Sequence, residues 1–148
     1  MIPAYHAGYV VDASVGVKWF VREREADREV ALALRQRHIE GATRMIVPEL
    51  FLLEVPNAIK TGRKSTEEEL AEVLATLADL DIRVEQHTQR VLRKTNAVAW
   101  AYKLTWYDAV YVALAETLGF PCVTADEALL RKMKGHSIVL RLKDLAFE

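Results

Sequence analysis

Short apolar runs of strand length alternate along this chain with longer segments of helical period. The runs that predict strands cover residues 8–13, 45–48, 82–84, 121–124 and 137–140. Between them, apolar residues recur every three or four positions, which is the spacing of one helix face. Strands that alternate with helices favour a parallel sheet, because a parallel connection crosses over through a helix. The sequence therefore predicts an α/β fold, with a five-stranded, mainly parallel sheet and helices on both faces.

The predicted helices have recognisable ends. They cover residues 14–20, 25–39, 49–61, about 65–80, 88–102, 108–118 and 126–134. Ser14 is a candidate cap for the first, and Ser65 with Glu68 forms a capping-box pattern. Gly62 and Gly119 follow helical segments and predict their ends. Two helices separate some successive strands, so the chain is not a simple repeat of one strand and one helix.

Length and composition fit one globular unit. The chain has 148 residues, of which 51% are apolar and 28% are charged, and we expect a single domain over residues 1–148. The one cysteine, Cys122, excludes an internal disulfide and a cysteine-rich zinc site. Because 20 basic residues face 21 acidic ones, a strongly basic nucleic-acid-binding domain is excluded, although a local basic patch is not.

The sequence predicts neither a membrane span nor an export signal. Asp12 and Lys18 interrupt the most apolar early stretch, residues 8–20, which is also too short to cross a bilayer. No basic segment precedes this stretch as a signal peptide requires. We expect a cytoplasmic protein, and a lone thiol fits that compartment.

Four acids occur inside apolar sequence, where acids are usually rare. Asp12 follows a predicted strand, Glu54 lies inside a predicted helix, Asp108 opens another helix, and Asp126 follows a later strand. Ligand sites of parallel sheets lie beyond the carboxyl ends of the strands. Three of the acids also suit a helix N-cap, so capping is an alternative explanation for Asp12, Asp108 and Asp126. Glu54 lies inside a predicted helix and cannot cap it. The alternative to a functional role is that Glu54 is an exposed acid on the polar face of that helix.

Several carboxylates that share one buried site repel one another and become protonated unless a cation compensates them. Oxygen ligands point to Mg²⁺ or Mn²⁺ and away from zinc. His6, His38, His87 and His136 are scattered without metal-binding spacing, so we expect them on the surface or in loops. A carboxylate-held divalent cation at the end of a parallel sheet suits phosphoryl chemistry.

Four blocks of sequence carry a family resemblance. They are Val10 to Ser14, Glu54 to Asn57, Tyr107 to Ala115 and Thr124 to Asp126, in this order. On these blocks the chain resembles the PIN-domain ribonucleases, and in particular the VapC-type toxins of toxin–antitoxin pairs. The resemblance implies a metal-dependent endoribonuclease (a hydrolase). The resemblance also implies that Asp12, Glu54 and Asp108 hold the principal Mg²⁺ or Mn²⁺ and that Asp126 completes the acidic cluster.

Three further residues match polar positions of that family. Ser14 and Thr124 match hydroxyls that orient a carboxylate or a water, with capping and strand-end hydrogen bonding as the alternative. Asn57 matches the Glu-x-x-Asn spacing and should project from the same helix face as Glu54. Pro56 lies between these two residues, so we expect the helix to kink or break there.

The resemblance also implies partners. They are an RNA substrate, a cognate antitoxin that sends a basic side chain into the acidic site, and a second copy of the chain in a homodimer. Trp106 and Tyr107 can stack an unpaired base, with core packing as the alternative for at least one. Candidate phosphate-binding cations are Lys60, Arg63, Lys64, Arg93, Lys94, Lys103, Arg131, Lys132 and Lys134.

Other classes fit the sequence less well. A receiver domain needs an acidic neighbour beside Asp12, and a haloacid-dehalogenase phosphatase needs Asp-x-Asp where this chain reads Asp12-Ala13-Ser14. Neither glycine-rich nucleotide-binding motif is present. A PIN-like domain that binds RNA or a partner without cutting it remains the non-enzymatic alternative.

Overall fold

The computed structural model describes residues 8–21 and 27–147. Its strands are β1 (Gly8–Val11), β2 (Arg44–Pro48), β3 (Arg83–Glu85), β4 (Cys122–Thr124) and β5 (Val139–Arg141). Its helices are α1 (Ala13–Val17), α2 (Arg28–Ile39), α3 (Phe51–Gly62), α4 (Glu67–Asp79), α5 (Gln89–Tyr102), α6 (Trp106–Leu118) and α7 (Glu127–Lys132), followed by the 3-10 turn η1 (Leu142–Asp144). The predicted start of the second helix at residue 25 lies outside the described residues.

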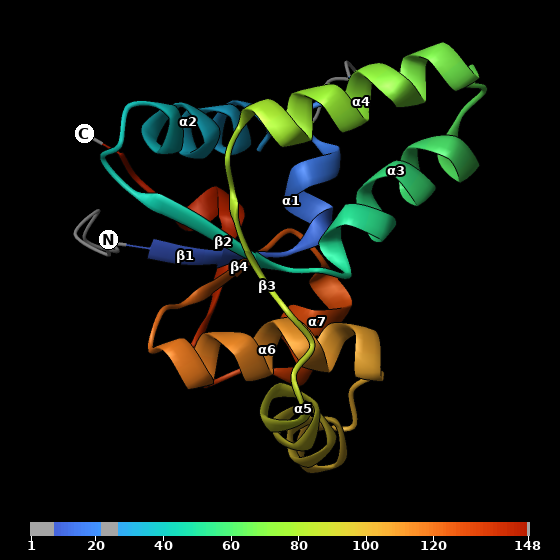
Figure 1. Cartoon of the computed structure of the whole chain (residues 1–148). Coiled ribbons are helices and arrows are strands. Elements are labelled where there is room, and N and C mark those ends of the chain that lie inside the picture. The colour runs from blue at the N-terminus through green and yellow to red at the C-terminus, as the bar shows by residue number, and fades with distance from the viewer. Residues whose placement is uncertain (1–7, 22–26, 148) are drawn as a thin grey trace.

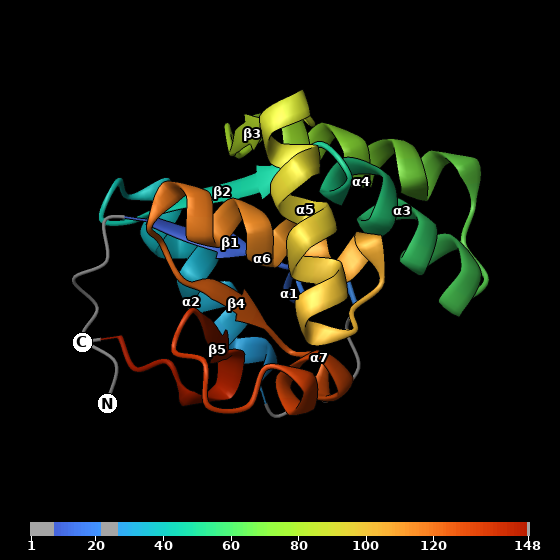
Figure 2. The same cartoon turned by 90° about the horizontal axis from the view of Figure 1, so that it is seen from below.

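The five strands form one sheet in the order β3-β2-β1-β4-β5. All four strand pairs are parallel, which confirms the predicted α/β class. Helices α1 to α4 cover one face of the sheet, and α5, α6 and α7 lie on the other (Figures 1 and 2). The strands run in one direction, so their carboxyl ends meet at one edge, beside the starts of α1, α3 and α6.

Burial explains why β1 and α6 form the centre of the molecule. Every residue of β1 is buried, as expected for a strand with neighbours on both sides and helices on both faces. In α6 the residues from Ala109 to Ala115 are all buried, because the sheet covers one side of this helix and α5 covers another. Among the described residues, no helix is both long and apolar enough to cross a membrane.

Several helix ends differ from the predictions by one to three residues. Thr66, and not Ser65, caps α4 by accepting a hydrogen bond from the backbone N–H of Glu69. Thr105 caps α6, so that helix starts at Trp106, two residues before the predicted start. Ser14 does not cap α1 but lies inside it, and α1 ends at Val17, three residues before its predicted end. At α4 and α6 a neighbouring threonine has the better position to accept from the first free N–H groups.

His38 is buried on α2, contrary to the prediction of a surface or loop position. Its Nδ1 accepts a hydrogen bond from the Met45 backbone N–H at 3.0 Å, so in the neutral ring Nε2 carries the proton and donates it to the Leu80 carbonyl at 2.7 Å. The ring therefore connects α2, β2 and the end of α4. Both nitrogens are used in this structural role.

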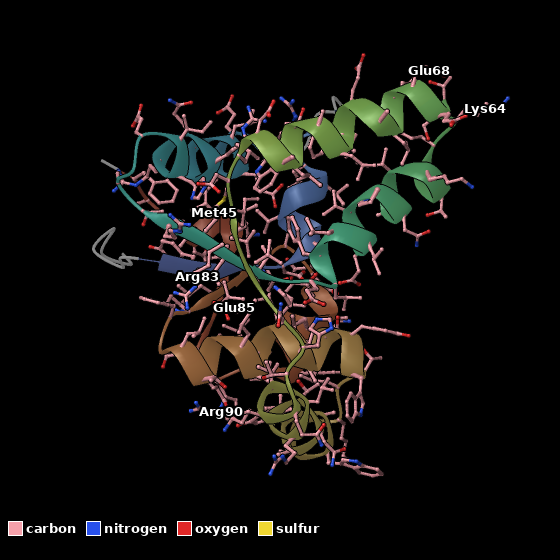
Figure 3. All side chains as sticks on the ribbon, viewed as in Figure 1. Met45, Lys64, Glu68, Arg83, Glu85 and Arg90 are labelled. Carbon is pink, nitrogen blue, oxygen red and sulfur yellow. The ribbon has the colours of Figure 1, made fainter. Side chains whose placement is uncertain are left out.

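The sequence predicts a kink or a break at Pro56, and the break does not occur, because α3 continues through this residue. Glu54 and Asn57 therefore stay on one continuous helix. The α3–α4 hairpin extends away from the sheet, and Figure 3 shows Lys64 and Glu68 at its tip. Arg83 and Glu85 form a salt bridge of 2.5 Å on the edge strand β3.

A close contact between α1 and α3 at Gly16 sets the spacing of these two helices. A Cβ atom at position 16 would lie 2.6 Å from Phe51 Cζ and 3.0 Å from Val55 Cγ2. Phe51 is fully buried, so its ring cannot swing aside. Because α1 directly follows Asp12 and α3 carries Glu54, this contact also sets the distance between two candidate site residues.

We predict that Gly16→Ala destabilises the protein by about 1–3 kcal/mol, the usual cost of overpacking a core. Gly62→Ala is the matched control, because a Cβ there has no neighbour within 4 Å. Chemical denaturation of the two variants measures the effect. Equal stability of Gly16→Ala and the wild type would contradict the packing argument.

Candidate active site

Asp12 is placed by the pairing of β1 with β4. Val11 pairs with Val123, so the next residues along each strand, Asp12 and Thr124, come side by side at the carboxyl edge. The Asp12 backbone N–H donates to the Val123 carbonyl at 3.0 Å. Asp12 is only 6% exposed and has no basic partner within residues 8–21 and 27–147, which is unusual for a buried acid.

Two hydroxyl groups hold the Asp12 carboxylate. Ser14 Oγ donates to Asp12 Oδ2 at 2.5 Å, and Thr124 Oγ1 donates to the same oxygen at 2.9 Å. The hydroxyls are themselves held, because Ala125 N–H donates to Ser14 Oγ and Asp126 N–H donates to Thr124 Oγ1. This network joins the start of α1 to the loop between β4 and α7. The structure thus brings Ser14 and Thr124 to the carboxylate that the sequence predicted.

Asp126 has the capping role that the sequence left open. Its Oδ1 accepts hydrogen bonds from the backbone N–H groups of Ala128 and Leu129, at 2.8 and 3.3 Å. Capping and membership of the acidic cluster are compatible, because both capping bonds use the same carboxylate oxygen, Oδ1. The negative charge of Asp126 also raises the pKa of both Asp12 and Asp108.

Glu54 is half-buried, and not part of an exposed polar stripe. The hydroxyl of Tyr111 donates to Glu54 Oε1 at 2.7 Å. Tyr111 is 1% exposed, and its hydroxyl stays protonated because burial and the neighbouring Glu54 charge raise its pKa. The contact fixes Glu54 of α3 against α6.

Asp108 lies in the first turn of α6, one turn before Tyr111. Its backbone N–H is capped by Thr105 Oγ1 at 3.1 Å, so Asp108 is not itself the cap. Burial raises the pKa of its carboxyl, the charges of Asp12 and Asp126 raise it further, and the Lys132 ammonium lowers it. The positive charge of Lys132 thus partly offsets the negative charges around Asp108.

Burial and mutual repulsion act on the other carboxylates too. Burial raises the pKa of Asp12, against the lowering effect of the bonds from Ser14 and Thr124. Burial also raises the pKa of Glu54, and the charges of Asp12 and Asp108 add to the rise. Four side chains from separate elements are therefore near enough to disturb one another, as the sequence suggested.

The donor set fits a hard divalent cation chemically, because it consists of carboxylate and hydroxyl oxygens. Within residues 8–21 and 27–147, however, no three His, Cys, Asp or Glu side chains are already gathered closely enough to hold one ion. Glu54 is held toward Tyr111 and Asp126 toward the start of α7. An ion would therefore have to draw these carboxylates inward from their present hydrogen bonds.

The remaining predicted residues lie further from the cluster. Asn57 is exposed on α3, one turn after Glu54. Among the candidate cations, Lys94 forms an ion pair with Glu116 at 3.0 Å, and Lys132 Nζ donates to the Lys103 carbonyl at 3.2 Å. Lys132 is thus the candidate that the structure connects to Asp108.

Tyr111 is the site residue that the sequence analysis did not single out. It lies three positions after Asp108, and therefore on the same face of α6. A buried tyrosine hydroxyl needs a hydrogen-bond partner. Glu54 is the one of the four candidate acids that could not serve as a helix cap, so it was free to be that partner. That requirement is the signal that could have paired the two residues.

The geometry agrees with comparisons to known proteins. The PIN domain family profile matches residues 9–135, a range that contains all four acids. The chain belongs to the PIN domain family. A curated relative, the ribonuclease VapC3 of Pyrobaculum aerophilum, is 31% identical over 127 residues, which cover 83% of this chain and 92% of that protein.

Solved structures share the fold. A crystal structure of a Pyrobaculum aerophilum protein has a TM-score of 0.64 and 25% identity, covering 95% of this chain and 93% of that one. A toxin–antitoxin complex from Klebsiella pneumoniae has a TM-score of 0.63 and 18% identity, covering 90% and 97%. A member of the VapBC family of toxin–antitoxin systems from Mycobacterium tuberculosis has a TM-score of 0.55 and 18% identity, covering 91% and 97%. At 18% identity, the similarity to the last two structures shows a shared fold and nothing more.

We predict that Thr124→Val destabilises the protein by about 1–3 kcal/mol. Valine keeps the shape but removes a donor to Asp12 and leaves the partly buried Asp126 N–H without its acceptor. Thr117→Val is the control, because the Thr117 hydroxyl only donates back to the Ala113 carbonyl of its own helix. Urea denaturation compares the two variants. A loss no larger for Thr124→Val than for Thr117→Val would contradict the network's role.

We predict that Asp108→Asn raises the melting temperature of the metal-free protein near pH 7. The folded state raises the pKa of Asp108 above its ordinary 3.8 and so binds the proton more tightly than the unfolded chain. Stability is therefore lost as pH rises from about the ordinary pKa through the raised one. Asparagine does not ionise, so the variant avoids this loss.

Thermal melts in EDTA, at a pH below the ordinary pKa of Asp108 and again near pH 7, measure the difference in melting temperature between Asp108→Asn and the wild type. The difference should be close to zero below the ordinary pKa of 3.8 and on the order of a few degrees near pH 7. Asp79→Asn, at an exposed position of α4, should show no such change. A variant that melts below the wild type near neutral pH would refute the repulsion argument.

Proposed function

We propose that this protein is a divalent-metal-dependent endoribonuclease that hydrolyses phosphodiester bonds in RNA. The observation that carries the proposal is the meeting of Asp12, Glu54, Asp108 and Asp126 at the carboxyl edge of the sheet. The pKa of Asp12, of Glu54 and of Asp108 is each raised in part by the charge of another acid of this set, which supports a shared electrostatic site. The relative with 31% identity is a ribonuclease, which supports RNA as the substrate.

Asp12, Glu54 and Asp108 would hold the principal Mg²⁺ or Mn²⁺, with Asp126 completing the cluster. When bound there, such an ion supplies a water of lowered pKa and stabilises charge on the phosphate. The chain's own part is positioning. Ser14 and Thr124 fix the Asp12 carboxylate through the bonds described above, and Tyr111 fixes Glu54.

The substrate's negative charge needs a cation outside the carboxylate cluster. Lys132 supplies one, because its ammonium is close enough to lower the pKa of Asp108. Its hydrogen bond to the Lys103 carbonyl holds it at the turn between α5 and α6. Lys132 is thus placed to neutralise a phosphate of an RNA strand that enters beside Asp108.

We further propose that the protein is the toxin of a toxin–antitoxin pair that acts in the cytoplasm. Two structural neighbours are toxin–antitoxin proteins, and the PIN-domain relative is a VapC ribonuclease. The partner would be a cognate antitoxin whose basic side chain neutralises the carboxylates. The homodimer stays a prediction, which light scattering on the purified protein tests.

Cleavage of a circular single-stranded RNA tests the nuclease directly, because only an internal cut can open a circle. We expect wild type to cut it in Mg²⁺ or Mn²⁺ and not in EDTA. Asp108→Asn should lower the rate by at least about 100-fold, because it removes a ligand charge at the reacting centre.

Asp79→Asn makes the same change of charge at an exposed position and should keep wild-type activity. Cleavage that survives in EDTA, or equal cleavage by Asp108→Asn and the wild type, would contradict the proposal. RNA binding that is equal with and without metal, with no cleavage under either condition, would favour the non-catalytic alternative.

A further inference from the structure

A groove of about 350 Å³ lies between the start of α3, the loop after β3, and helices α5 and α6. Leu53 lines it from α3, and Trp106 and Tyr107 line it from α6. Two of these residues directly precede candidate site acids, since Leu53 comes before Glu54 and Tyr107 before Asp108. Leu50 also lines the groove, and it lies four positions before Glu54 and therefore on the same face of α3. The groove thus continues along α3 from the candidate site acid Glu54.

The walls of the groove expose large apolar side chains. Leu53 is 70% exposed, Tyr107 is 65% exposed and Trp106 is 47% exposed. The alternative that at least one of the two aromatic residues packs in the core is therefore wrong. Exposed aromatic side chains gathered at one concave place are typical of a binding surface, because their exposure to water is unfavourable.

The polar groups that line the groove determine which chemical class of ligand it can bind. His87 Nε2 accepts from the Leu50 backbone N–H at 3.4 Å, so in the neutral ring Nδ1 carries the proton as a donor. Glu49, which is exposed, adds a carboxylate acceptor. A carboxylate repels phosphate but accepts from the N–H groups on the edge of a base. The groove therefore complements a nucleobase and not the RNA backbone.

Two candidate cations for the RNA backbone are connected to the segment just before Trp106. Lys103 ends α5 in the left-handed conformation, with φ 55°, and lies three residues before Trp106. Its carbonyl holds the Lys132 ammonium. Aromatic side chains for bases next to ammonium groups for phosphates form the combination that binds single-stranded nucleic acids.

We propose that this groove is the subsite for an unpaired base next to the scissile phosphate, with Trp106 and Tyr107 stacking on its face. Glu49 selects guanine, whose N1–H and N2–H are two adjacent donors for one carboxylate. This inference rests on the proposed nuclease function and adds its substrate preference. Cleavage should therefore occur beside guanine in single-stranded RNA.

A pool of single-stranded RNAs with randomised sequence tests the subsite. The wild-type protein is incubated with the pool and Mn²⁺, and the ends of the products are sequenced. We expect guanine to be enriched at one position beside the cut. Glu49→Gln, which weakens the acceptor without changing the size of the side chain, should flatten that enrichment.

Steady-state kinetics on one preferred oligonucleotide test the stacking. Trp106→Ala and Tyr107→Ala should each raise KM by about 5-fold to 100-fold and change kcat less. Trp100→Ala is the matched control, because Trp100 is 79% exposed and does not line the groove. Circular dichroism and melting temperatures confirm that each variant is folded.

The possible results separate this inference from the proposed function. Without metal-dependent cleavage by the wild type, both fail. With such cleavage, an unchanged KM in Trp106→Ala and Tyr107→Ala overturns the stacking, and a random base distribution beside the cut overturns the role of Glu49. The inference also fails if light scattering shows a wild-type dimer that Trp106→Ala converts to monomer, because a second copy of the chain then occupies the groove.

Discussion

The buried carboxylate of Asp12 is the group on which the arrangement of the site depends. It lies where two neighbouring parallel strands end, is 6% exposed, and accepts hydrogen bonds from the hydroxyls of Ser14 and Thr124. Those hydroxyls in turn accept from backbone N–H groups of the loop after β4. One acid thus ties together β1, α1, β4 and the start of α7. The same bonds offset part of the cost of burying its charge.

The second constraint is helix α6, which carries Asp108 and Tyr111 one turn apart. Because nearly every residue of its central part is buried against the sheet and the other helices, the helix cannot shift without disturbing the core. Asp108 is thereby held beside Asp12, while the Tyr111 hydroxyl holds Glu54 of α3 at 2.7 Å. The protein keeps mutually repelling carboxylates together through the packing of the whole fold. This arrangement is unfavourable as long as no cation compensates the negative charges.

The sequence predicted the sheet, the helices and the four acids because each depends on local pattern. Short apolar runs define strands, and an acid inside apolar sequence stands out wherever the fold places it. The sequence could not decide which hydroxyl caps a helix, as Thr66 in place of Ser65 shows, because neighbouring candidates differ only in backbone position. It also did not pair Tyr111 with Glu54, since the two lie 57 positions apart. That contact depends on how the tertiary fold brings α3 and α6 together, and the need of a buried tyrosine hydroxyl for a partner was the one signal that could have pointed to it.

The central claim is that these carboxylates together bind one kind of divalent cation. Calorimetric titration of Mn²⁺ into the metal-free protein near neutral pH tests it most directly, with wild type, Asp12→Asn and Asp79→Asn measured side by side. We expect saturable binding to wild type and to Asp79→Asn, and loss of that binding in Asp12→Asn. Equal binding by all three proteins would contradict it, because the metal would then be held by residues other than Asp12 and its neighbours.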